Sequence, residues 1–309
     1  MATPDVDWLI PGNLRLERGP NNLRRLHVQT GRAVAHIYLA GAHVARFAPR
    51  IATEEADPAL NGVLFLSTSS HFAEGKAIRG GVPVIFPWFG PRDGKPGAPM
   101  HGFARTSLWQ LETSRFDPAG FVEIVLRLES SAATLAAWPH SFVLRHIIRV
   151  DATLTMSLQV ENNGPEPFTF EEALHTYLAV ADVRNVTVDG LQGCDYLDKT
   201  DGGARKHEAS SRIRFEGETD RVYLNTQGRC TVNDAEGKRR LVVDKSSSAT
   251  TVVWNPWSAK AAALADLGND EWPHFVCIET ANAAENRITL APGKMHMEWS
   301  AIACNESMS

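Results

Sequence analysis

The sequence predicts an all-β protein made of two broad antiparallel sheets packed face to face. Three observations predict this class: apolar and polar residues alternate with a period of two along many runs, clusters of Gly, Pro, Asn and Asp separate those runs, and few segments show helical spacing. With 309 residues, of which 43% are hydrophobic and 22% charged, the chain can bury one sizeable core. No linker-like stretch divides it, so we expect a single domain over residues 1–309.

The individual elements follow from the same pattern. Strand-like alternation marks residues 122–129, 142–150, 153–161, 250–254 and 287–302. Turn sequences such as Ala291-Pro292-Gly293 lie between or within these runs and suit hairpins and longer loops. Two short helices are expected, one over the alanine-rich residues 129–138 before Pro139, and one over residues 259–267, which also fit a loop with one helical turn. Helices are therefore accessories to the sheets.

The segment 78–109, IRGGVPVIFPWFGPRDGKPGAPMHGFARTSLW, predicts loops and short edge strands that form a pocket for a small anion. Its glycines, Gly80 and Gly81 among them, permit positive φ or a close approach of the backbone, and its prolines disfavour a helix. Arg79 and Arg105 offer planar donors to a phosphate or carboxylate beside His101, and several aromatic rings supply walls on which a sugar could stack. The alternative is an irregular surface loop whose arginines pair with nearby acids.

Two ionisable residues stand in apolar, strand-like surroundings, and they are candidates for acid–base chemistry. Glu279 in CIET would project to the face opposite Val276 and Ile278, where burial raises the pKa of a carboxyl group and suits a general base. His175 in ALHTYL can give or take a proton near neutral pH, which suits a general acid. The alternatives are a structural histidine and a solvated strand glutamate.

A third candidate is Asp220 in TDRVY, which follows a turn and precedes a strand-like run. Its carboxylate could accept a sugar hydroxyl. It could equally cap a turn by accepting hydrogen bonds from backbone N–H groups.

Other function classes lose support from what the sequence lacks. There is no GxGxxG, GxxxxGK[ST], HExxH or GxSxG motif, and four widely spaced cysteines form no CxxC pair, so we expect no cofactor, no metal site and reduced thiols. A net charge of -5 without a basic face argues against nucleic-acid and membrane partners, which leaves a small molecule. Because neither a signal peptide nor a run of 18 apolar residues is visible, we expect a cytoplasmic protein, and we expect a monomer.

Six motifs in order resemble the hexose-6-phosphate epimerase family, also called glucose-6-phosphate 1-epimerase, a branch of the aldose 1-epimerase or galactose mutarotase-like proteins. The motifs are IRGGVPVIFPWFG at 78–90, HGFAR at 101–105, ALHTYL at 173–178, TDRVY at 219–223, WNPW at 254–257 and CIET at 277–280. Each is weak alone, whereas their shared order is specific. The resemblance covers a core of about residues 22–302.

The resemblance implies a large antiparallel β-supersandwich with the sugar in a cleft on its concave sheet. It also implies cofactor-independent interconversion of the α and β anomers of a hexose 6-phosphate, glucose 6-phosphate above all. The implied roles are general acid for His175, general base for Glu279, and substrate binding for Arg79, His101, Arg105 and Asp220. One departure is Met100, which stands where the family often has a substrate-contacting glutamine, so the sugar preference stays open.

Three other functions are consistent with parts of the pattern. A sugar-phosphate-binding protein without turnover would not need a matched acid and base, and an epimerase of free aldoses would not need paired arginines. A glycoside hydrolase or lyase would need two carboxylates across a glycosidic bond, for which Glu279 and Asp220 are the candidates. Further cations that could help to hold a phosphate are Arg92, Lys95 and Lys260.

Overall fold

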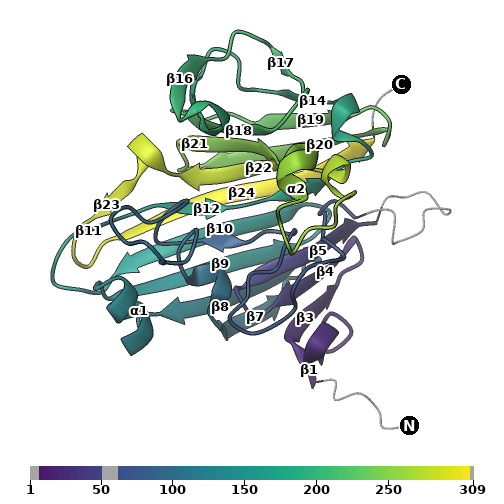
Figure 1. Cartoon of the computed structure of the whole chain (residues 1–309). Helices are drawn as coiled ribbons and strands as arrows, with labels where there is room; N and C mark the ends of the chain where they lie inside the picture. The colour runs from purple at the N-terminus through teal and green to yellow at the C-terminus, as the bar shows by residue number, and fades with distance from the viewer. Residues whose placement is uncertain (1–6, 51–61, 307–309) are drawn as a thin grey trace.

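The computed structural model describes residues 7–50 and 62–306, which fold into antiparallel sheets in two layers (Figure 1). One layer is a nine-stranded sheet. The other combines an eight-stranded and a five-stranded sheet, and an isolated bridge from Val44 on β5 (His43–Pro49) to Val82 leads toward β6 (Val84–Ile85) of the eight-stranded sheet. The all-β prediction and the sandwich of two broad sheets are confirmed.

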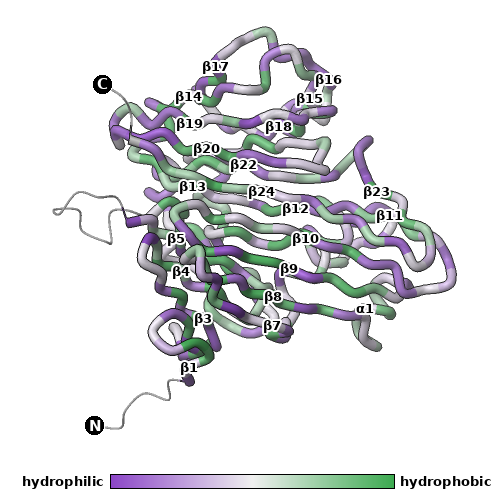
Figure 2. Tube along the Cα trace, turned by 180° about the vertical axis from the view of Figure 1, so that it is seen from behind, coloured by the Kyte–Doolittle hydropathy of each residue, from purple (hydrophilic) through white to green (hydrophobic). Residues whose placement is uncertain are grey.

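The nine-stranded sheet runs in the order β17-β14-β19-β20-β24-β10-β9-β8-β7 and is seen from behind in Figure 2. Its strands are β7 (Gln110–Phe116), β8 (Val122–Glu129), β9 (Phe142–Val150), β10 (Leu154–Asn162), β14 (Val186–Asp189), β17 (Arg212–Ile213), β19 (Cys230–Asp234), β20 (Arg239–Ser246) and β24 (Met295–Glu306).

The eight-stranded sheet runs in the order β16-β15-β18-β21-β22-β12-β6, and β13 also pairs with β22. Its strands are β6 (Val84–Ile85), β12 (Glu172–Leu174), β13 (Tyr177–Ala179), β15 (Asp195–Asp198), β16 (Ala204–His207), β18 (Thr219–Leu224), β21 (Thr250–Asn255) and β22 (Phe275–Asn282).

The remaining elements are shorter or lie at the edges. The five-stranded sheet consists of β1 (Asp7–Ile10), β2 (Leu14–Arg18), β3 (Arg24–Gln29), β4 (Ala33–Tyr38) and β5 (His43–Pro49), and a two-stranded sheet pairs β11 (Phe168–Phe170) with β23 (Ile288–Leu290). The α-helices are α1 (Ala132–Ala137) and α2 (Trp257–Ala261), and the 3-10 turns are Pro20–Asn22, Ala104–Thr106, Val183–Asn185, Lys199–Asp201, Trp272–His274 and Ala284–Asn286. In the described ranges no helix is long and apolar enough to cross a membrane.

Strand β22 shows how the sequence divides the two faces of the eight-stranded sheet. Val276 and Ile278 enter the large core between the layers, while Phe275 and Cys277 join a second apolar cluster on the opposite face. Burial of an aliphatic side chain of this size contributes about 1.5–3 kcal/mol, so both faces of the strand are held firmly. By the same alternation Glu279 lies on the second face, as the sequence predicts.

Most of the expected elements are confirmed with small shifts. The expected strands at 122–129 and 142–150 coincide with β8 and β9. The strand expected at 153–161 is displaced by one residue from β10, and the one expected at 250–254 ends one residue before β21 does. The run 287–302 is broken at its Pro-Gly turn into β23 and β24, and α1 begins after a Ser131 capping box and ends before Pro139. Of the two alternatives for residues 259–267, the loop with one helical turn is confirmed, because α2 is a single short helix that begins earlier, at Trp257, and ends at Ala261.

Candidate active site

His175 and Glu279 oppose each other on neighbouring antiparallel strands. Leu174 pairs with Thr280 and Tyr177 with Cys277, so the intervening register sets His175 across from Glu279. His175 lies in the short break between β12 and β13, and its Nε2 is 3.3 Å from Oε1 of Glu279. The structure therefore brings the two proposed proton-transfer residues together on the face away from the main core.

The imidazole of His175 is held by aromatic rings on three sides. It stacks on Tyr177 with ring centroids 4.8 Å apart and an interplanar angle of 11°, and it meets the rings of Trp254 and His101 edge-on at 5.9 Å and 5.8 Å. Its backbone N–H donates to the Pro83 carbonyl at 3.0 Å. Only 7% of His175 is exposed, so its ring orientation is preorganised before a ligand arrives.

Burial shifts both members of the pair toward their neutral forms. Glu279 is 1% exposed, and this burial, followed by the negative charge of Asp220, raises its pKa well above the usual value. Burial also lowers the pKa of His175 well below its usual value, and the positive charges of Arg105 and Arg79 add to the effect of the neighbouring His101. Both shifts favour the neutral pair, in which a shared proton lies on Glu279. Glu279 Oε2 and His175 Nδ1 are buried and have no hydrogen-bond partner.

Because of this raised pKa, Glu279 lowers the free energy of unfolding at neutral and alkaline pH. Because its folded-state pKa lies above the unfolded value near 4.5, the folded chain binds more protons, and stability falls as the pH rises above that value. We expect Glu279→Gln to have a higher melting temperature than the wild type near pH 8. The difference between the two melting temperatures should become smaller toward pH 4. Thermal unfolding across this pH range measures the effect, and a pH-independent difference would refute the buried-carboxyl explanation.

Arg79 is anchored by residues that its own segment does not reveal. Its Nη1 donates to the Tyr177 hydroxyl at 2.9 Å, and its Nε and Nη2 donate to Oδ1 of Asp266 at 3.1 and 3.0 Å. Asp266 lies in the region expected to be helix or loop and carried no chemical signal in the sequence. Arg79 therefore stands beside the pair with its charge already balanced by a carboxylate.

The adjacent glycines are required by close contacts with neighbouring backbone segments. Gly80 and Gly81 have φ of 107° and 60°, and a Cβ on them would lie 2.4 Å from the Phe65 carbonyl oxygen and 2.3 Å from that of Val44. The expected positive φ is confirmed, and the close approach is to the backbone of this chain rather than to a ligand. It sets the position from which Arg79 projects.

His101 and Arg105 come from the loop that follows. The Gly90 N–H donates to His101 Nδ1 at 3.1 Å, so the ring proton sits on Nε2, and burial followed by the charge of Arg105 lowers the His101 pKa to about 3. Arg105 donates from Nη2 to the Met100 carbonyl at 2.7 Å, while its buried Nε has no partner. Within residues 7–50 and 62–306 no carboxylate forms an ion pair with Arg105. Its positive charge is thus available to an anionic ligand.

Met100, the departure from the resembled family, contributes its backbone to the site. Its side chain is 51% exposed, whereas its carbonyl oxygen holds Arg105. The change from glutamine to methionine therefore does not remove the hydrogen bond that holds Arg105, because the backbone carbonyl makes it.

Asp220 lies on the same face as His175 and Glu279. It is the register partner of Trp254 on β21, which in turn pairs with Cys277 on β22. Burial raises its pKa despite the opposing charge of Lys260, whose Nζ lies 4.0 Å away. Lys260 Nζ itself donates a hydrogen bond to Glu218 at 2.6 Å, so its charge is balanced by the carboxylates of Glu218 and Asp220.

The other two candidate cations do not join this group. Arg92 lies over the Trp88 ring at 4.8 Å and lines a hollow of about 550 Å³ that adjoins the site through Phe89 and Val222 but contains neither His175 nor Glu279. Lys95 is exposed in the loop beyond Arg92.

The fold and the site define a class of protein: an all-β protein in which a buried imidazole and a buried carboxyl group lie side by side on one face of a sheet. Family comparison agrees, because a model described as aldose 1-epimerase matches residues 24–302. The chain belongs to the aldose 1-epimerase family, and it is an isomerase of the mutarotase type.

Individual relatives extend over nearly the whole chain. A protein of Escherichia coli K12 is 37% identical over 93% of this chain and 92% of its own length, and one of Cenchrus ciliaris is 36% identical over 92% and 84%; both carry a provisional glucose-6-phosphate 1-epimerase name. A crystal structure from Salmonella typhimurium, provisionally described as a mutarotase, superposes with a TM-score of 0.88 at 32% identity and covers 98% of this chain and 97% of that one. The supersandwich expected from the resemblance is confirmed.

Proposed function

We propose that this enzyme interconverts the α and β anomers of a hexose 6-phosphate, with glucose 6-phosphate as the principal substrate. The observation that carries the proposal is the His175 Nε2 to Glu279 Oε1 contact of 3.3 Å beside an Arg105 without a carboxylate partner. The names of the relatives from Escherichia coli and Cenchrus ciliaris support the same substrate.

The reaction needs two proton transfers and no cofactor. Glu279 as a carboxylate takes the proton of the anomeric hydroxyl, while His175 as an imidazolium donates a proton to the ring oxygen, so the ring opens to an aldehyde. Rotation about the C1–C2 bond and closure with the reverse transfers give the other anomer and restore both residues. In this proposal Asp220 accepts a hydrogen bond from a sugar hydroxyl, and His101 donates one from Nε2.

The charges required for this step differ from those favoured in the free protein. Burial favours the neutral forms of both residues, and hence a shared proton on Glu279, whereas the proposed turnover starts with that proton on His175. A phosphate dianion against Arg105 would cancel part of the positive potential that opposes a charged His175. Substrate binding would then move one proton across the pair without net uptake from solvent, and the limbs of a bell-shaped pH profile would report the pair as a unit.

We expect this transfer to be visible as a change in the His175 resonances. In ¹⁵N-labelled protein near neutral pH, His175 should be a neutral imidazole when free and an imidazolium with 1,5-anhydroglucitol 6-phosphate, which cannot open. The control ligand is 1,5-anhydroglucitol, which lacks the phosphate and should leave His175 neutral. An imidazolium in the free protein, or the same response to both ligands, would refute the role of the phosphate.

Exchange spectroscopy on glucose 6-phosphate tests the function itself. The enzyme should speed exchange between the two anomeric resonances well beyond the spontaneous and buffer-catalysed rate. Parallel samples with free glucose and galactose test the alternative that the substrate is a free aldose. One observation favours this alternative: Arg79 already forms an ion pair with Asp266, which leaves it less able to bind a phosphate. Faster exchange of glucose than of glucose 6-phosphate would favour that alternative, and unchanged exchange of all sugars would indicate a binding protein.

A further inference from the structure

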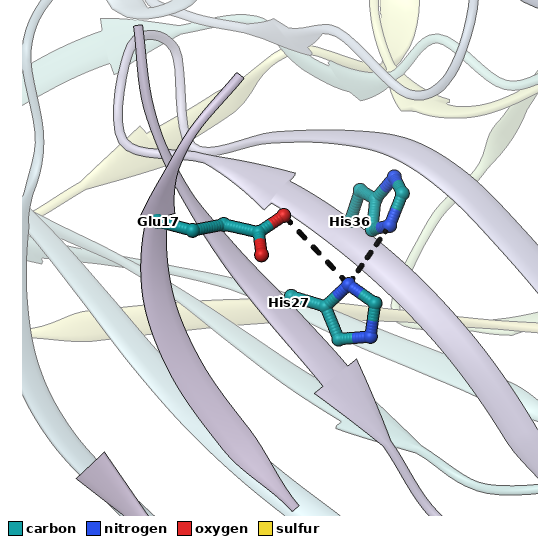
Figure 3. A group of neighbouring side chains, drawn as sticks. All are labelled: Glu17, His27 and His36. Atoms are coloured by element: carbon teal, nitrogen blue, oxygen red, sulfur yellow. Dashed lines mark hydrogen bonds and ion pairs between the residues drawn. The ribbon is translucent and has the colours of Figure 1, made fainter. Parts of the chain in front are cut away.

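A second cluster of chemically active side chains lies on the five-stranded sheet, with no residue in common with the catalytic group. Glu17, His27 and His36 come from the adjacent strands β2, β3 and β4 (Figure 3). His27 and His36 are direct register partners. They alternate with Leu26 and its neighbours in the core, so the cluster occupies the outer face of the sheet.

The three donor atoms converge on one point. His27 Nδ1 lies 3.1 Å from His36 Nε2 and 3.7 Å from Oε1 of Glu17, and all three lie within 4.8 Å of one another. In the described part of the chain this is the one such group of three His, Cys, Asp or Glu ligands. Ligands about 2.0–2.2 Å from a tetrahedral zinc ion are roughly 3.3–3.6 Å apart, so side-chain shifts of about an ångström or less would bring the three into coordination distance.

Arginine side chains hold one of the three ligands in place. Arg15 Nε donates to Glu17 Oε2 at 2.7 Å and Arg25 Nε donates to Glu17 Oε1 at 2.8 Å, which fixes the orientation of the carboxyl group as outer-shell partners do in metal sites. A single N–H···N hydrogen bond would explain the contact between the two histidines. The nearby Glu17 carboxylate adds a third ligand atom, so the three side chains together can coordinate a metal ion.

The same arginines decide which ion fits. Arg15, Arg25 and the nearby Arg46 repel a dication, so ions held mainly by charge on carboxylate oxygens, such as Ca²⁺ and Mg²⁺, are excluded. Ions that form strong bonds to imidazole, such as Zn²⁺, Ni²⁺ and Cu²⁺, can overcome this repulsion. Salt should screen the repulsion and leave the affinity undiminished, unlike binding at an acidic surface.

We propose that Glu17, His27 and His36 form a binding site for a divalent transition metal ion that ties together three strands of the five-stranded sheet. The site lies outside the catalytic group, so the ion stabilises the fold and takes no part in turnover.

Calorimetric titration of metal-free protein with Zn²⁺ tests this site. We expect saturable binding of one ion per chain, a rise in melting temperature with Zn²⁺, and affinity at least about tenfold weaker in His36→Gln and in His27→Gln. The matched control is His207→Gln, which removes an exposed histidine that also contacts a carboxylate, that of Asp195 at 3.0 Å, and should bind Zn²⁺ as the wild type does. Anomer exchange by His36→Gln should equal that of the wild type.

Three results would overturn the proposal. They are no saturable Zn²⁺ binding by the wild type, undiminished binding by both histidine variants, and Ca²⁺ binding as strong as Zn²⁺ binding. The wild-type titration decides the first and third even if a variant fails to fold.

Discussion

Glu279→Gln is expected to lower kcat for glucose 6-phosphate by roughly 10²- to 10⁴-fold, the usual contribution of one proton-transfer group. The amide fills the same space opposite His175 but can neither accept the anomeric proton nor share a proton with Nε2 at 3.3 Å. His175→Asn should lose a similar factor. Because the two residues act as a unit, the double variant should be little worse than either single one. Polarimetry starting from the pure α anomer measures these rates.

The matched control for this prediction is Glu298→Gln. Glu298 on β24 is likewise fully buried with a raised pKa, caused mainly by burial, but it has no contact with His175. Turnover by this variant should stay close to that of the wild type, provided that circular dichroism shows both variants folded. Equal losses at Glu279 and Glu298 would mean that the effect is structural.

Arg105→Ala is expected to reduce kcat/KM for glucose 6-phosphate by roughly 10- to 150-fold, which corresponds to about 1.5–3 kcal/mol for a lost charge-assisted hydrogen bond. The loss for free glucose should be much smaller, because free glucose has no phosphate for the guanidinium to bind and Arg105 forms no ion pair with a carboxylate of the described residues. Adding phosphite dianion to glucose should speed the wild type and leave Arg105→Ala unaffected. Steady-state kinetics on both sugars give the ratio.

Two comparisons make the Arg105 result interpretable. Arg184→Ala removes an exposed arginine paired with Asp182 and should change neither substrate's kinetics. Arg79→Ala should impair both sugars, because Arg79 also supports the Tyr177 ring on which His175 stacks. Equal effects of Arg105→Ala on glucose and glucose 6-phosphate would remove its role in phosphate recognition.

The sequence predicts the fold best where one face of a strand is buried and the other is exposed to solvent. Strands β8 and β9 show this alternation and were placed correctly, whereas the five-stranded sheet was not foreseen in detail. Strand β3, for example, reads RRLHVQ and offers only two apolar positions to the core, which is too short a pattern to separate from a loop. The scarcity of helical spacing correctly predicted that helices are accessories to the sheets, since α1 and α2 are both short.

The site was predictable in its residues and less so in its arrangement. His175 and Glu279 stood out as ionisable groups within apolar runs, yet their contact depends on a long-range register between β12–β13 and β22 that no local pattern encodes. Nothing in the sequence marked Asp266, because its ion pair with Arg79 exists only once folding brings the two residues together. The protonation of the pair likewise depends on burial and on cations from distant loops, such as Arg105.

The most direct test of the central claim is NMR exchange between the anomers of glucose 6-phosphate with wild-type enzyme and with Glu279→Gln in matched samples. Enzyme-accelerated exchange in the first sample and exchange at the buffer rate in the second are predicted. Equal acceleration by the two proteins would contradict the assignment of the proton transfer to the His175–Glu279 pair.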